Sequence, residues 1–160
     1  MRVMVSFLDK LCPHERLVAS VAALPRPLVF TNGVFDILHR GHVTYLEQAR
    51  ALGRSLIVGL NSDASARALG KAPNRPLNGE LDRACVLAAL ESVSLVTLFD
   101  EATPVDLIKQ VRPDLYVKGG DYDVETLEET RVVRSLGGDA HTLPFVAGYS
   151  TTSLVARIRG

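Results

Sequence analysis

His39 and His42 stand three positions apart with Gly41 between them, and their type and spacing suggest chemistry. In a helix, side chains three positions apart lie on the same face, so both imidazoles can reach one ligand. The free N–H groups and the dipole of a helix start attract anions. Imidazoles placed there can donate hydrogen bonds to phosphate oxygens as charge builds up on them. The pattern therefore predicts a phosphate-binding site.

Metal binding is the competing interpretation of the histidine pair. A zinc site takes three or four protein ligands, and His14 and His141 have no ligand-like spacing to the pair. Cys12 and Cys85, the only cysteines, form no CxxC motif, and Cys85 lies in a helical pattern that predicts a buried free thiol. We therefore expect no resident metal.

The segment before the histidines leaves an apolar run and opens a helix, which is where doubly wound sheets bind ligands. Gly33 lets the backbone turn sharply and approach a ligand closely. Asp36, the nearest carboxylate, either organises the site or caps the turn that follows Phe35. Four residues of this segment are expected to contact the ligand: Asn32, Gly33, Val34 and Phe35.

A second anion site is predicted at the start of the last helix. Hydroxyl side chains gather there after a glycine, more of them than one helix cap requires. The residues are Gly148, Tyr149, Ser150, Thr151, Thr152 and Ser153.

Two further segments carry charge or glycine at expected strand ends. In Lys118-Gly119-Gly120-Asp121-Tyr122, the glycines let a flat base lie against the backbone. Lys118 either neutralises a phosphate or is a solvated lysine, and Tyr122 either stacks on a base or packs. The loop 70–79 carries Lys71 and Arg75, and a polar loop of this length in a compact domain is more often functional than not.

The secondary structure predicted from apolar periodicity is an alternation of strands and helices. Five apolar runs predict strands at Leu28–Thr31, Ser55–Leu60, Leu95–Phe99, Leu115–Lys118 and Ala140–Leu143. Helical spacing covers Gly41–Leu52, Ala64–Leu69, Glu80–Leu90, Pro104–Val111, Val124–Leu136 and Thr152–Arg159. Such runs, separated by amphipathic helices, indicate an α/β fold with a doubly wound, five-stranded parallel sheet.

The N-terminal segment Ser6–Ala23 also has helical spacing and ends at the prolines that flank Arg26. We therefore expect a helical extension over residues 1–26 and an α/β domain over residues 27–160. The extension can pack on the sheet or against a second subunit, which leaves a homodimer possible.

Composition limits the classes of partner. Eighteen basic and eighteen acidic side chains cancel, so no overall field draws the chain to nucleic acid or to a membrane. Charges interrupt the apolar N-terminal residues, and no apolar stretch approaches the ~18 residues of a membrane span. We expect a cytoplasmic protein whose partners are small molecules.

His-x-Gly-His (39–42) after Gly-x-Phe-Asp (33–36) resembles the signature of the cytidylyltransferase-like nucleotidyltransferase superfamily. Three more segments, 58–63, 117–122 and 148–153, resemble its D-glycero-β-D-manno-heptose 1-phosphate adenylyltransferases of lipopolysaccharide precursor synthesis. The resemblance runs from Pro27 to Arg159 and implies a Rossmann-like nucleotidyltransferase fold. In many relatives a sugar kinase precedes this domain, so a stand-alone form is expected here.

The resemblance implies transfer of AMP from ATP, with Mg²⁺, to the heptose 1-phosphate, giving ADP-heptose and pyrophosphate. It implies that His39, His42 and Lys71 are catalytic, that residues 148–153 hold the triphosphate and that 118–121 lie near the nucleoside. Cytidylyltransferase relatives carry Arg at the position of Phe145, which makes cytidine a less expected base. Substrate contacts are expected from Asp36, Arg75 and Arg83, although Arg83 can equally pair with a neighbouring acid.

Three alternatives stay open. The first is another transferase of this fold, using CTP with glycerol 3-phosphate or a phosphoamine, or ATP with phosphopantetheine. The second is a non-catalytic nucleotide sensor on the same scaffold. The third is a fragment of a class I aminoacyl-tRNA synthetase, whose His-x-Gly-His turn is similar but which needs a tRNA-binding surface.

Overall fold

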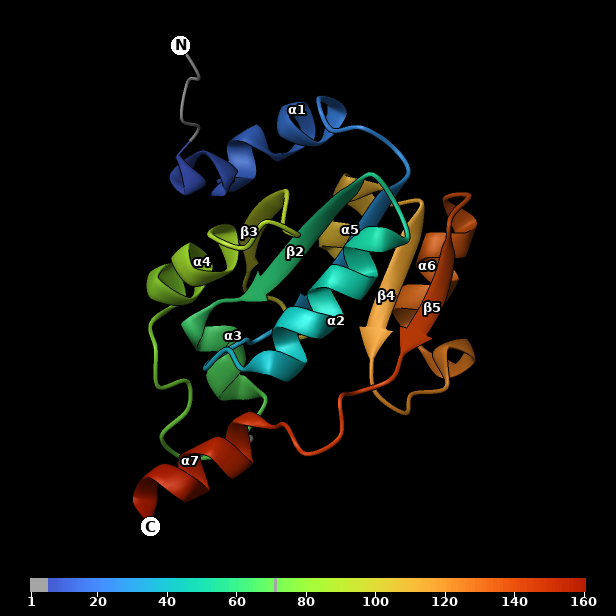
Figure 1. Ribbon diagram of the computed structural model, residues 1–160. Coiled ribbons are helices and arrows are strands. Elements are labelled where there is room, and N and C mark those ends of the chain that lie inside the picture. The colour runs from blue at the N-terminus through green and yellow to red at the C-terminus, as the bar shows by residue number, and fades with distance from the viewer. Residues whose placement is uncertain (1–5, 71) are drawn as a thin grey trace.

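The computed structural model describes residues 6–70 and 72–160, and its centre is one parallel sheet (Figure 1). The strands lie in the order β3-β2-β1-β4-β5, and every pair is parallel. Their bounds are β1 Leu28–Gly33, β2 Ser55–Asn61, β3 Leu95–Phe99, β4 Leu115–Gly119 and β5 Asp139–Leu143. The predicted five-stranded α/β fold is confirmed.

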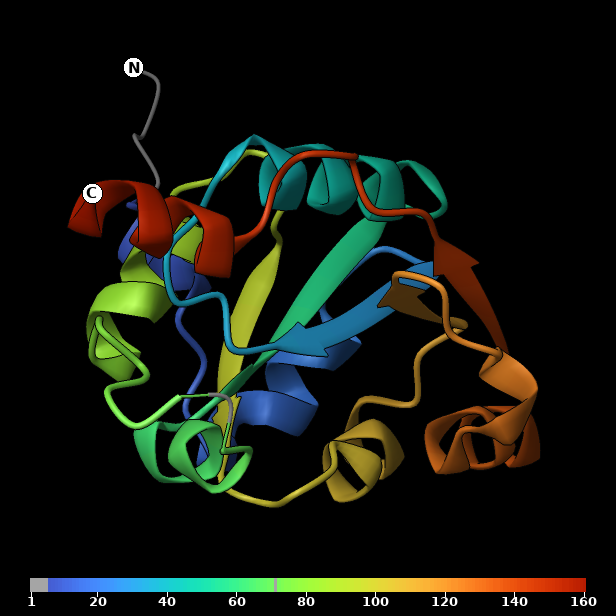
Figure 2. The ribbon, with the colours of Figure 1, turned by 90° about the horizontal axis from the view of Figure 1, so that it is seen from below.

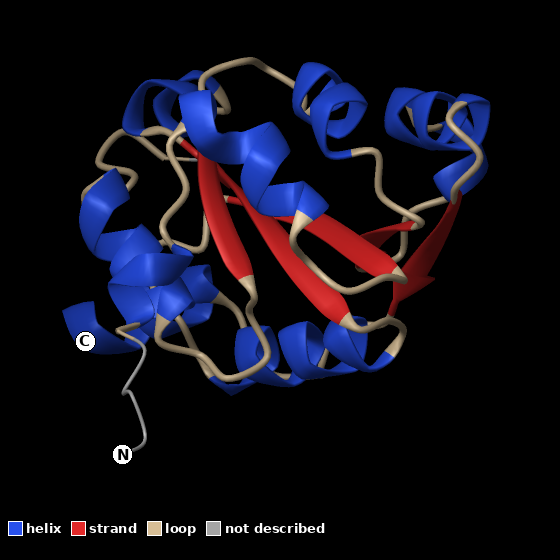
Figure 3. Cartoon of the chain, turned by 90° about the horizontal axis from the view of Figure 1, so that it is seen from above, coloured by secondary structure: helices blue, strands red, loops and turns tan. Residues whose placement is uncertain are grey.

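Helices cover the sheet on both sides (Figure 3). The α-helices are α1 Leu17–Ala22, α2 Arg40–Ala51, α3 Asp63–Ala68, α4 Glu80–Ala88, α5 Val105–Val111, α6 Glu128–Ser135 and α7 Thr151–Arg159. Short 3₁₀ helices span Phe7–Lys10 (η1), His14–Arg16 (η2) and Val124–Thr126 (η3).

Two hydrophobic cores lie on opposite faces of the sheet because successive strand side chains alternate in direction. On β1, Phe30 packs in the core with α1 and α5, whereas its neighbour Val29 packs in the core with α2 and α4. Figure 2 shows α2 on one side of the sheet and α1, α5 and α6 on the other. Both cores are closed by fully buried aliphatic side chains, so the strands are held in fixed positions.

The N-terminal segment is not the continuous helix that its spacing predicts. It breaks between η1 and η2, where Leu11 bridges Val96 and the backbone N–H of Cys12 donates to the Val96 carbonyl over 2.9 Å. Val96 lies on β3, an edge strand whose outer backbone N–H and C=O groups have no neighbouring strand. An extended segment can form hydrogen bonds with these groups, whereas a helix cannot. Leu17 and Val21 then enter the core beside α5.

Two smaller predictions are also corrected. The helix predicted over Val124–Leu136 divides at Leu127, whose backbone is extended (φ −79°, ψ 136°) and whose side chain packs against the core. Cys85 is partly exposed, whereas Cys12 is the buried thiol; both are free.

Leu17 tests whether the N-terminal segment stabilises the domain. Because its side chain is fully buried, Leu17→Ala should lower the free energy of unfolding by about 2–5 kcal/mol. Val18→Ala is the matched control, since Val18 is 64% exposed and its truncation should cost under ~0.5 kcal/mol. Urea unfolding of both variants measures the difference. Equal small effects would show that the segment does not contribute to the core.

Candidate active site

The carboxyl ends of the parallel strands lie at one end of the sheet, and the start of α7 lies beside the loop that leaves β1 (Figure 2). The Tyr149 ring stacks on the His39 ring with centroids 6.2 Å apart. The Thr151 hydroxyl donates to the Ile37 carbonyl over a long 3.4 Å. Segments more than a hundred residues apart in sequence therefore meet at the first turn of α2.

His39 and His42 form a stacked pair at that turn. Their ring centroids are 3.8 Å apart at an interplanar angle of 20°, and the edge of Phe35 packs against His42. The Nδ1 atom of each ring is buried, and neither has a hydrogen-bond partner among the described residues. A buried polar atom left unpaired costs about 1–3 kcal/mol, so two at one place call for a functional explanation.

Burial also sets the charge of the pair. Desolvation, followed by repulsion from His39, lowers the pKa of His42 to about 4, with a hydrogen bond to the Ile37 backbone acting in the opposite direction. Desolvation lowers the pKa of His39 as well. Both rings are therefore neutral near pH 7, each with one N–H donor and one acceptor nitrogen. An anion bound beside the stacked rings would favour their protonation.

Gly41 is the residue that allows this arrangement. A Cβ at position 41 would lie 2.9 Å from the His39 ring and 3.0 Å from the Tyr149 Cβ. Any side chain would therefore push His39 off the helix start or move α7 away. His39 occupies the N-cap position of α2 without capping it through its side chain, so the first N–H groups of α2 have no side-chain acceptor from this residue.

At the start of α7, the hydroxyls divide between capping and open positions. Ser150 accepts from the Ser153 backbone N–H over 3.0 Å and donates to the Ser153 hydroxyl over 2.7 Å. Thr152 instead faces a pocket that lies against the 72–77 loop. Gly148, with φ +85°, turns the chain into the helix. The predicted set of hydroxyls is thus gathered at one helix start, with half of it engaged in the cap.

At the end of β4, an aromatic ring lies on two glycines. A Cβ on Gly120 would meet the Phe145 ring at 2.5 Å, and one on Gly119 would meet it at 3.1 Å. Phe145 is nevertheless 68% exposed. The Lys118 ammonium lies over the Tyr122 ring, 5.1 Å from its centroid. The edge predicted to receive a flat base is therefore an exposed aromatic platform, and Asp121 beside it is exposed.

Asp36 neither caps its own turn nor faces solvent; it holds the described 72–79 part of the predicted loop. Its carboxylate accepts from the backbone N–H groups of Leu77 and Asn78 at 2.8–2.9 Å. Asn78 returns a side-chain hydrogen bond to the Asp36 carbonyl over 2.8 Å. The Arg75 guanidinium lies 3.5 Å from the same carboxylate. Asp36 thereby holds this loop against the segment that follows β1.

Arg83 requires a correction. Its side chain is fully buried, and its guanidinium donates to the carbonyls of Val34, Asn61 and Asn78 at 2.7–2.9 Å. A further hydrogen bond, of 2.8 Å, goes to the Asp63 carboxylate. Because its described hydrogen-bond partners all lie inside the protein, Arg83 is not available to contact a substrate directly. Arg83 links the segment after β1 to the end of β2 and to Asn78.

Other predicted residues have structural partners or lie outside the description. The Asn32 side chain accepts from the Tyr116 hydroxyl over 2.8 Å. Gly33 lies under the Phe35 ring, where a Cβ would be 2.9 Å from it. Lys71 lies outside the described residues.

Sequence reasoning missed Tyr45, which joins α2 to the sheet below the histidines. Its buried hydroxyl shares a 2.6 Å hydrogen bond with Thr31 and donates to the Val117 carbonyl over 3.1 Å. Burial raises the pKa of Tyr45 to about 12, so the hydroxyl stays protonated. The signal available in the sequence was a tyrosine on the apolar face of the helix that follows the histidines.

The described residues contain no group of three or more His, Cys, Asp or Glu side chains that could hold a metal ion. Asp36, the carboxylate nearest the pair in sequence, already accepts several N–H bonds. Magnesium commonly binds through one or two carboxylates and the phosphates of a substrate. The side chains therefore do not form a protein cage for it.

No helix in the described ranges has the length and apolar character of a membrane span.

Comparison with known proteins places this geometry in a family. The model of the cytidylyltransferase-like family matches residues 30–157. The chain is 59% identical over 155 residues to a D-beta-D-heptose 1-phosphate adenylyltransferase of Bordetella bronchiseptica, covering 96% of each chain. It is 53% identical over 133 residues to the Bifunctional protein HldE of Syntrophotalea carbinolica, where the match covers 83% of this chain and 27% of that protein.

A solved structure shows the same fold. The lipopolysaccharide core biosynthesis protein of Thermoplasma volcanium matches with a TM-score of 0.62 and 30% identity, over 74% of this chain and 95% of that one. A pantothenate synthetase of Thermus thermophilus matches with a TM-score of 0.58 at 18% identity, a likeness of fold alone.

The depressed pKa of His42 makes a prediction for stability. Unfolded histidine titrates near 6.5, and folded His42 titrates near 4. The unfolded state therefore binds more protons between these values, so the contribution of neutral His42 is present above pH 6.5 and is lost as pH falls toward 4. Urea unfolding at pH 7, 5.5 and 4.5 should show a smaller acid loss in His42→Asn than in the parent. Parallel pH profiles would contradict the assignment.

Proposed function

Since the chain belongs to the cytidylyltransferase-like family, we propose that it transfers AMP from ATP to D-glycero-β-D-manno-heptose 1-phosphate. The products are ADP-heptose and pyrophosphate. The observation that carries the proposal is the stacked His39–His42 pair, neutral and with one buried, unpaired Nδ1 atom in each ring, at a helix start that attracts anions. The relative from Bordetella bronchiseptica, whose name states this heptose chemistry, supports the choice of acceptor.

The reaction needs no protein nucleophile. An oxygen of the acceptor phosphate attacks the α-phosphorus of ATP in line, a new P–O bond forms, and the bond from the α-phosphorus to the bridging oxygen breaks. That oxygen leaves on pyrophosphate with the electron pair. Charge spreads over the phosphoryl oxygens in the transition state, so positioning and electrostatic stabilisation supply the rate.

His39 and His42 provide that stabilisation in this proposal. Neutral rings bind the incoming phosphates without a fixed charge, and negative charge building up on the oxygens strengthens their hydrogen bonds. The first N–H groups of α2 face the same anion. Because Gly41 and Tyr149 fix the His39 ring, little reorganisation is needed during the reaction.

The other segments bind and position. The start of α7 holds the outer phosphates through Thr151, Thr152 and its free N–H groups. Adenine lies on the exposed ring of Phe145 at Gly119–Gly120. This ring can stack on the base, whereas the Arg that cytidylyltransferase relatives are expected to carry here would offer a charge. Mg²⁺ would enter with ATP and would neutralise charge on its phosphates.

A substrate panel tests the reaction. Pyrophosphate release should be fastest with ATP and D-glycero-β-D-manno-heptose 1-phosphate, in the presence of Mg²⁺. The comparison reactions use CTP with glycerol 3-phosphate and ATP with phosphopantetheine. Faster release with either pair would assign a different transferase. Binding of ATP without pyrophosphate release from any acceptor would indicate a nucleotide sensor.

The same assay tests the histidine role. His42→Ala should lower kcat at least ~100-fold, the usual cost of removing a donor to developing charge, while the circular dichroism spectrum is unchanged. His141→Ala is the control, because that imidazole is exposed on β5 next to Asp139. Near-normal turnover by His42→Ala would refute the mechanism.

A further inference from the structure

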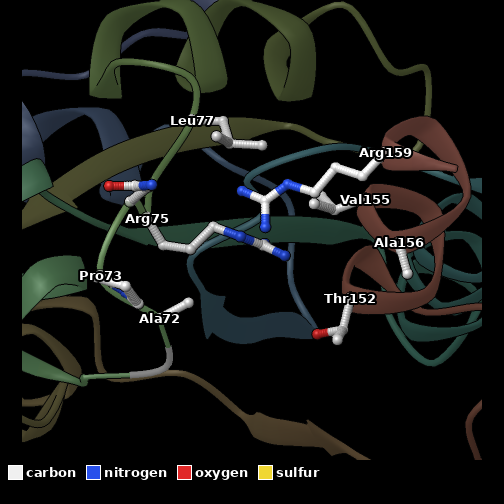
Figure 4. Close-up of a pocket in the computed structure, with 9 residues that line it drawn as sticks. Ala72, Pro73, Arg75, Leu77, Thr152, Val155, Ala156 and Arg159 are labelled. Carbon is white, nitrogen blue, oxygen red and sulfur yellow. The ribbon is translucent and has the colours of Figure 1, made fainter.

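A pocket lies between the 72–77 loop and α7, beside the site described above. Its volume is about 230 Å³, several times the ~30 Å³ that one water occupies in the liquid. Leu77 and Val155 form part of its wall, and Thr152 lies at the end nearest the start of α7. Figure 4 shows side chains from both segments reaching into the space between them.

Two guanidinium groups point into this pocket from opposite sides. Arg75 reaches in from the loop and Arg159 from the last turn of α7 (Figure 4). Two like charges directed at the same space repel each other, although Arg159 is exposed and water screens part of this repulsion. Such an arrangement becomes favourable when an anion lies between the two groups.

Neither guanidinium is fully neutralised within the described residues. Arg75 has only a long 3.5 Å contact with Asp36, whose carboxylate already accepts hydrogen bonds from the backbone of Leu77 and Asn78. Within residues 6–70 and 72–160, no carboxylate approaches within 4 Å of Arg159. Both groups therefore keep donors for a ligand.

The pocket also adjoins the histidine site. Thr152 contributes to its lining, while the preceding residue, Thr151, donates to Ile37 on the loop between β1 and His39. The first turn of α7 thus faces the histidines on one side and the two guanidiniums on the other. A chain of phosphates that begins at the imidazoles and passes this helix start would end in the pocket.

We propose that the Arg75–Arg159 pocket binds a phosphoryl group, and that this group is the terminal phosphate of the nucleotide. Both guanidiniums donate to its oxygens, and it leaves as the distal half of pyrophosphate. The assignment to the nucleotide rests on the proposed adenylyl transfer. The binding of a phosphoryl group between the two arginines rests on the pocket alone.

Binding of inorganic pyrophosphate, measured by isothermal titration calorimetry at constant ionic strength, tests the pocket. Arg159→Gln should weaken binding about tenfold, the usual effect of losing a hydrogen bond to a charged group. Arg159→Lys keeps the charge but loses the planar fork, so its loss should be smaller. Arg157→Gln is the matched control, since Arg157 is exposed on the same helix and does not line the pocket; it should bind as the parent does.

Steady-state kinetics distinguish the two sources of the phosphoryl group. A higher KM for ATP in Arg159→Gln, with the KM for the sugar phosphate unchanged, supports the terminal phosphate. A higher KM for the sugar phosphate alone overturns that assignment in favour of the acceptor. Equal pyrophosphate affinity in the parent, Arg159→Gln and Arg157→Gln overturns the pocket. Arginine-dependent binding of pyrophosphate by a parent protein that releases none from any substrate would sink the proposed function and leave the pocket standing.

Discussion

The position of the site depends on the direction in which the chain winds away from β1. Helix α2 carries it to β2 on one side, and β4 lies on the other, so the strand order reverses at β1. At such a point no crossover connection covers the carboxyl ends of the strands, and doubly wound sheets bind ligands in the crevice that is left. Because all five strands are parallel, the exits of β1, β4 and β5 lie at this same edge. The histidine pair, the aromatic platform and the start of α7 are close together for that reason.

The histidine pair and the surrounding arginines differ in charge and in burial. The imidazoles are kept neutral by burial, which lowers their pKa values, so the central position carries no fixed charge. Arg83 is buried and donates hydrogen bonds to backbone carbonyls and to Asp63, which holds the segments that it joins in place. Arg75 and Arg159 supply positive charge farther out, on a loop and on a helix without buried residues. A rigid centre with cations on peripheral elements suits a ligand whose charge extends outward from the reacting atom.

The parts of the fold that sequence predicted are those governed by local periodicity. Apolar runs located all five strands within two residues at each end, and His-x-Gly-His located the start of α2. The errors concern pairing between distant segments. Nothing near Asp36 shows that its partners are backbone groups of Leu77 and Asn78, about forty residues later. The break in the N-terminal helix depends on the free edge of β3, and the position of Arg159 depends on how the 144–150 segment directs α7.

In the proposed mechanism, the loops at the carboxyl ends of the strands hold a polyphosphate against the imidazoles. A crystal structure with a non-hydrolysable ATP analogue tests it most directly. We expect α-phosphoryl oxygens within hydrogen-bonding distance of the His39 and His42 rings, with the outer phosphates at the first turn of α7. An analogue bound with its phosphates remote from both rings would contradict the account.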